Sequence, residues 1–84
     1  MPYIPPDQRK KFGHLENLGN RIDNPGELNY VLTKIVKGYI DKCGVSYVVY
    51  NAVMGVLACM TQELYRRLIS GYEDSKIQEN GDVY

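Results

Sequence analysis

The densest run of apolar residues covers positions 46–69, SYVVYNAVMGVLACMTQELYRRLI, and predicts one long helix. Its main stripe repeats at steps of three and four residues, through Val49, Val53, Val56, Met60, Leu64 and Leu68. The first half is apolar nearly all round, because further residues broaden the stripe: Val48, Ala52, Ala58 and Cys59. Several of these and Gly55 are small, so another helix can approach closely. Such a helix needs more cover than 84 residues easily supply, and we predict self-association through it.

A second helix is predicted over residues 25–42. Asn24 is placed to cap it, Pro25 suits the first helical position, and Glu27 lies three residues after Asn24, as in a capping box. Its apolar stripe consists of Leu28, Leu32, Ile35, Val36, Tyr39 and Ile40. Gly44 is placed to end this helix in a left-handed conformation, and Ser46 to cap the long helix that follows.

Two weaker helices are predicted at the ends of the chain. After an extended arm at residues 1–6, apolar residues at helical steps indicate a helix from Pro6 or Asp7 to Ile22, weakened by Gly13 and Gly19. Ser70-Gly71 predicts a kink or stop, and residues 72–80 a short fourth helix that ends at Gly81. We therefore predict a single all-α domain over residues 1–84, a small bundle of three main helices plus a short C-terminal one, in an oligomer.

Charge and cysteine content narrow the class of protein. Ten basic and ten acidic residues give no net charge, which argues against DNA and membrane-surface binding but leaves room for a small anion held by local arginines. No segment resembles a signal peptide or a membrane span. The two cysteines, Cys43 and Cys59, form neither a disulfide framework nor a metal-type spacing, and we expect a cytoplasmic protein with reduced thiols.

The sequence contains few residues that could serve as catalytic groups. His14 is the only histidine, and a surface role suits it better than general acid–base chemistry. No nucleophile motif, phosphate-binding glycine loop or metal-ligand cluster occurs. We expect a protein that is not an enzyme and that uses neither cofactor nor metal.

One group of residues is suggestive of ligand binding. Arginine holds phosphate or carboxylate through a planar fork, and tyrosine can stack on a base. The candidate site, placed at a subunit boundary, consists of Tyr65, Arg66, Arg67, Tyr72, Asn80 and Asp82. The competing interpretation is an ordinary surface ion pair, since Glu63 lies three and four residues before the two arginines. The tail 79–84 either docks in a groove of a neighbouring subunit or extends freely.

Segments spread over most of the chain resemble a family of small uncharacterised proteins from tailed phages and prophages. These segments are MPYI at residues 1–4, PGELNY at 25–30, YNAV at 50–53, GVL at 55–57, ELYRR at 63–67, YED at 72–74, KI at 76–77 and ENGDVY at 79–84. The resemblance implies a small protein made in the cytoplasm of an infected host cell. It brings no established activity.

Two functions remain open at this point. The first is an oligomeric sponge that sequesters a nucleotide-derived signal of host immunity; it rests on analogy with other small phage proteins. The alternative is a protein-interaction module that inhibits or scaffolds a host or phage protein.

Overall fold

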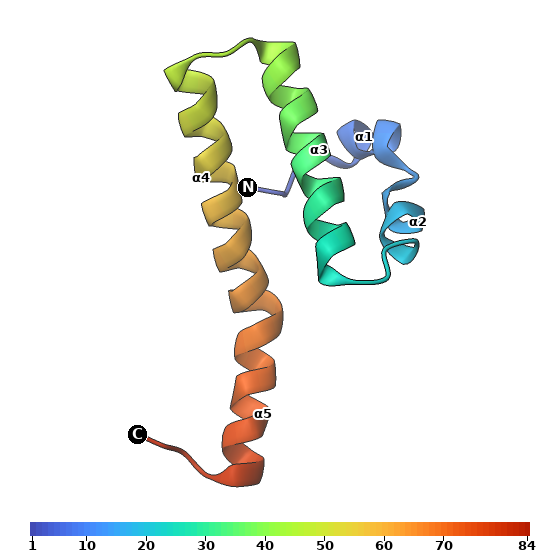
Figure 1. Ribbon diagram of the computed structural model, residues 1–84. Coiled ribbons are helices and arrows are strands. Elements are labelled where there is room, and N and C mark those ends of the chain that lie inside the picture. Colours follow the sequence, from blue (N-terminus) through green and yellow to red (C-terminus); the bar gives the residue numbers. More distant parts are fainter. The chain divides into compact units, whose positions relative to one another are not determined.

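The structure, a computed structural model, describes residues 1–84 and contains helices but no strands (Figure 1). Its elements are α1 (Pro6–Arg9), the 3₁₀ turn η1 (Lys10–Phe12), α2 (Leu15–Asn20), α3 (Pro25–Cys43), α4 (Tyr47–Leu64), the π-helical turn η2 (Tyr65–Ile69) and α5 (Ser70–Asn80). The predicted all-α fold is confirmed. The chain divides into two compact units, Pro2–Val53 and Met54–Tyr84, the second of which also includes Met1.

The predicted first helix does not form as one element. It breaks at Gly13-His14, where His14 has φ −102° and ψ 8°, outside the helical region. Glycine costs a helix interior about 1 kcal/mol relative to alanine, and the few apolar residues here do not compensate. The result is a short helix, a 3₁₀ turn and a second short helix in place of a continuous helix to Ile22.

The start of α3 follows the prediction closely. The Asn24 side chain accepts a hydrogen bond from the Glu27 amide at 2.9 Å. Glu27 reaches back and accepts from the Asp23 amide at 3.0 Å, one residue earlier than in a standard capping box. The bond to Asn24 satisfies one of the amides that the first helical turn leaves without a partner, and the bond from Asp23 fixes the residue that precedes the cap.

The turn between α3 and α4 uses glycine and serine for separate purposes. Gly44 has φ +90°, a region that favours glycine, and its amide donates to the Ile40 carbonyl to close the last turn of α3. Ser46 then caps α4, since its Oγ accepts from the Val49 amide at 3.2 Å.

The predicted stop at Ser70-Gly71 is wrong. Ser70 is helical, with φ −61° and ψ −40°, and α5 continues through Gly71 to Asn80. The departure from regular geometry comes one turn earlier, in η2. The helix ends at Gly81 as predicted, with φ +85° and its amide bonded to the Ile77 carbonyl.

The chain buries very little of its apolar surface. Val53 of α4, 8% exposed, is its one buried hydrophobic residue. A second group is half-buried: Leu18, Ile22, Val31, Val36, Ile40, Val49 and Leu57. Most other large apolar side chains face solvent, including Leu28, Ile35 and Tyr39 of the predicted α3 stripe. The helices therefore present apolar faces that the chain itself leaves open.

We predict that Asn24→Ala lowers the free energy of unfolding by about 1 kcal/mol, because it removes the acceptor for the Glu27 amide. Asn24→Ser restores a capping oxygen and serves as the matched control. Thermal unfolding followed by circular dichroism checks the difference. Equal melting temperatures for the alanine and serine variants would show that the cap does not stabilise α3.

Candidate functional site

Three residues of the candidate site, Tyr65, Arg66 and Arg67, lie in the π turn between α4 and α5. The Ser70 amide donates to the Tyr65 carbonyl, five residues back, and the Ser70 hydroxyl donates to the Arg66 carbonyl at 2.7 Å. The side chain thus satisfies the carbonyl that this amide would meet in an α-helix. Single π turns within α-helices occur often at functional sites, and this one therefore favours a functional role for Arg66 and Arg67.

The π turn also changes which residues share a face. It contributes one extra residue, so side chains beyond it are rotated relative to a regular α-helix. In a regular helix Arg67, seven residues after Met60, would continue the apolar stripe of α4. The extra residue brings Leu68 into that line instead and moves Arg67 to one side.

The two arginines differ in their surroundings. Both oxygens of Glu63 accept hydrogen bonds from Nη2 of Arg66, at 2.9 and 3.1 Å. The guanidinium of Arg67 makes neither a hydrogen bond nor an ion pair within the chain, and the residue is exposed. The ion-pair interpretation thus describes Arg66, while Arg67 is left open to an outside anion.

The tyrosines of the candidate site are both exposed. The Lys76 ammonium lies 5.4 Å from the centroid of the Tyr72 ring, in a cation–π contact, and also pairs with Glu79. A base stacked on Tyr72 would compete with Lys76 for that ring. Tyr65 has no such neighbour on its ring.

The remaining members, Asn80 and Asp82, lie at the far end of the same unit. Asn80 is the last residue of α5, and at about 1.5 Å rise per residue it lies about 20 Å along the helix from Arg67. Asp82 Oδ1 accepts from the Tyr84 amide at 2.9 Å, within the tail's own turn. One chain therefore does not bring the six residues together, and a joint site requires a second copy.

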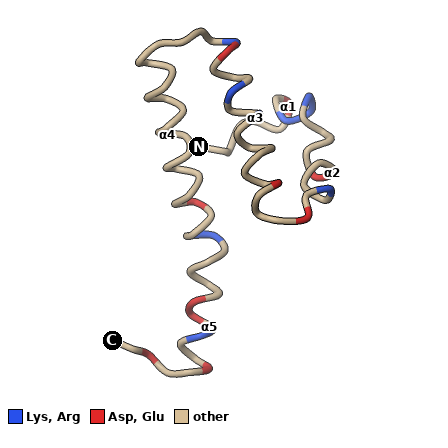
Figure 2. The backbone as a smooth tube through the Cα atoms, viewed as in Figure 1, with Lys and Arg blue, Asp and Glu red and all other residues tan.

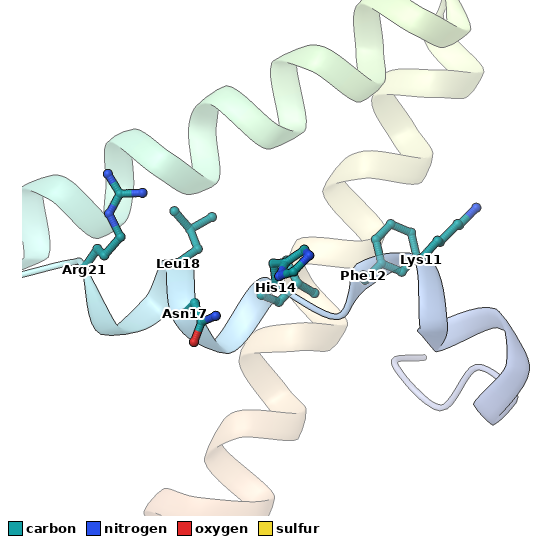
Figure 3. Close-up of a pocket in the computed structure, with 7 residues that line it drawn as sticks. Lys11, Phe12, His14, Asn17, Leu18 and Arg21 are labelled. Atoms are coloured by element: carbon teal, nitrogen blue, oxygen red, sulfur yellow. The ribbon is translucent and has the colours of Figure 1, made fainter.

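An open pocket of about 490 Å³ lies along η1 and α2, which sequence reasoning did not single out. Its lining combines basic and apolar side chains: Lys11, Phe12, His14, Leu15, Asn17, Leu18 and Arg21. Figure 3 shows Lys11 and Arg21 at opposite ends of the segment with His14 between them. The cationic groups do not converge on one point, and the Lys11 ammonium lies 5.1 Å from the Phe12 ring centroid.

The metal-ligating side chains of the chain are dispersed. No three His, Cys, Asp or Glu side chains are grouped so that they could hold a metal ion. The Tyr39 hydroxyl donates a hydrogen bond to the sulfur of Cys43, one turn further along α3, and this contact raises the pKa of the hydroxyl. The neutral phenol that it favours is a poor base. Both thiols are free and exposed.

Comparison with known proteins identifies a family. The sequence model described as Domain of unknown function (DUF6899) matches residues 1–83. The chain belongs to this family. No curated protein and no solved structure matches it. Within the structure, no helix combines the length and apolar character that a bilayer span requires.

Proposed function

We propose that this DUF6899 protein is a non-enzymatic binding protein that works as a homo-oligomer. The observation that carries the proposal is the set of apolar side chains that its helices leave uncovered. Val53 is the one buried hydrophobic residue, while large apolar side chains of α3 and α4 are exposed, Ile35 and Val56 among them.

Exposed apolar side chains are the kind of surface that association buries. Met54, Val56 and Leu68 are among the large exposed ones. Burial of such surface is the main favourable term in most protein association.

The unit 54–84 also leaves the apolar side chains of its helix uncovered. It consists of the second half of α4, η2, α5 and the tail, so it contains one continuous helix and no second element to cover it. Isolated helices are marginal in water, and most helical stability in proteins comes from packing of an apolar face. A partner chain would supply that packing.

We predict that the protein at micromolar concentration has at least twice the 9.6 kDa mass of one chain. Size-exclusion chromatography with multi-angle light scattering measures that mass directly. A monomer with full helical content would contradict the proposal, because the exposed helices would then be stable uncovered.

A second candidate function is favoured by the free guanidinium of Arg67. In the same π turn Tyr65 offers an exposed ring, and a second copy could bring Asn80 and Asp82 to this turn from the far end of another helix. Such a boundary would suit a nucleotide-type anion, with arginine on phosphate and tyrosine on the base. In the phage setting that the resemblance implies, the ligand would be a signal of host immunity and the protein its sponge.

We predict that a cyclic or adenine nucleotide raises the melting temperature of the protein, since a ligand bound only by the folded state stabilises it. The double variant Arg66→Ala/Arg67→Ala should lose the shift and keep its helical content. Lys34→Ala/Lys37→Ala removes the same charge from α3 and should keep the shift. A thermal-shift panel of nucleotides tests all three proteins.

Two results would count against the nucleotide site. A double arginine variant that binds as well as the parent would leave Arg66 as an ion-pair partner alone. No shift with any nucleotide, together with an oligomeric mass, would favour the protein-interaction module instead.

A further inference from the structure

The open pocket along η1 and α2, which we call the α2 pocket, offers apolar contact beside positive charge. Leu15 and Leu18 are three residues apart in α2 and therefore lie on one side of that helix. Leu18 is half-buried, whereas Phe12 and Leu15 are 47% and 56% exposed. Apolar side chains that line an open pocket in this way leave surface free for the apolar part of a bound group.

Positive charge lines the α2 pocket without an acidic side chain beside it. Lys11 and Arg21 are its two charged lining residues, and neither forms an ion pair within the chain. The Lys11 ammonium lies over the Phe12 ring, a contact that leaves it without a carboxylate. Glu16, the acidic residue of α2, does not line the pocket.

The other acidic residues of the N-terminal segment have positions or partners of their own. Asp23 and Glu27 do not line the α2 pocket. Glu27 lines the adjoining pocket with Arg21, and its carboxylate accepts from the Asp23 amide at 3.0 Å. Asp7 lies with Lys10 in the lining of a third pocket, where the two charges offset each other. The α2 pocket is therefore a local site of positive charge in a chain whose net charge is zero.

The separation of the two cations favours an extended segment over a compact anion. Figure 3 shows Lys11 and Arg21 at opposite ends of the pocket, with His14 and Leu18 between them. A single phosphate or carboxylate held by both cations would require them to converge. A short peptide that combines a carboxylate with apolar side chains would use a cation and the apolar lining together.

The tail of this chain has that composition. Gly81, with φ +85°, ends α5, and residues 82–84 follow it outside the helix. Val83 is 90% exposed and Tyr84 is fully exposed. One carboxylate oxygen of Asp82 accepts from the Tyr84 amide, which leaves the other oxygen without a partner in the chain. The tail thus presents a carboxylate and two large apolar side chains.

Charge around the tail is opposite in sign to that of the α2 pocket. From residue 70 onwards a single lysine occurs among four carboxylates: Glu73, Asp74, Lys76, Glu79 and Asp82. In Figure 2 acidic positions predominate along α5 and the tail. The arginines of η2 lie at the other end of α5. Arg66 pairs with Glu63, and Arg67 lies about 20 Å along the helix from Asn80.

We propose that the tail of one copy docks in the α2 pocket of a second copy, with Asp82 at its cations and Val83 and Tyr84 against its apolar side chains. This contact rests on the proposed homo-oligomer and identifies which surfaces meet. It also assigns the tail of the second copy to the α2 pocket and not to Arg67. Two copies that exchange tails form a closed pair in which the same contact occurs twice.

Charge reversal in the pocket and in the tail tests this contact. We expect the pocket variant Lys11→Glu/Arg21→Glu and the tail variant Asp82→Lys each to weaken association at least tenfold in sedimentation equilibrium, because repulsion replaces attraction. An equimolar mixture of the two variants should recover association. In that mixture each tail meets a pocket of the opposite charge on the other chain.

Controls separate the contact from general effects of charge and of unfolding. Lys34→Glu/Lys37→Glu makes the same change of charge on α3, outside the α2 pocket, and should associate as the parent does. Circular dichroism should show the helical content of the parent in every variant. Asp82 lies outside the helices, so the tail variant keeps the test valid even where the pocket variant loses helix.

Two results would place the tail elsewhere and overturn the contact. A mixture that stays dissociated, while a chain with all three substitutions associates, would place each tail in the pocket of its own chain. Loss of association in Arg67→Glu, together with unchanged association in the pocket variant, would place the tail of the second copy at η2.

The same measurements keep the two proposals apart. A parent protein that is monomeric by light scattering removes the homo-oligomer and with it this contact. An oligomeric parent that is indifferent to both charge reversals keeps the oligomer and rejects only the docked tail.

Discussion

Lack of cover for α4 is the constraint on which the rest of the structure depends. The helix is uncharged from its first residue to Gln62, and the chain buries Val53 while leaving most of its other apolar side chains open. Water disfavours that exposure by an amount roughly proportional to the area. The short helices of the N-terminal segment are too small to offset it. The exposed stripe of α3 adds to the same deficit, which the proposed homo-oligomer would relieve.

Local signals in the sequence predicted helix ends well, because each depends on a few neighbouring residues. Asn24 with Glu27 fixed the start of α3, Ser46 the start of α4, and Gly44 and Gly81 the ends of α3 and α5. Each assignment needs only one side-chain hydrogen bond or one positive φ. The same local logic failed at Ser70-Gly71, where a serine and a glycine that usually interrupt a helix lie inside one. There the serine hydroxyl bonds the Arg66 carbonyl and the helix continues.

The candidate site was harder to predict because it depends on the directions in which side chains leave the helix and on the distances between them along its axis. Tyr65, Arg66 and Arg67 were assigned together from their adjacency, but the π turn in which they lie leaves no pattern of its own in the sequence. Asn80 and Asp82 were grouped with them on the assumption of a bend at Gly71. The helix continues through that glycine, so these residues lie about 20 Å further along it. The pairing of Arg66 with Glu63 follows from helical spacing and could be predicted.

The π turn has a consequence for how the chain tolerates changes in length. Its extra residue is accommodated by the backbone and serine hydrogen bonds of the turn. Loss of one residue between positions 65 and 69 would leave an unbroken α-helix of nearly the same length. The side chains of α5 would keep their direction relative to α4, because Leu68, which already lies in line with Met60, would become the seventh residue after it. Loss of one residue elsewhere in α4 or α5 would instead turn every later side chain by about 100°. The turn is therefore the place in this helix where the chain can lose a residue and still present the same side of α5.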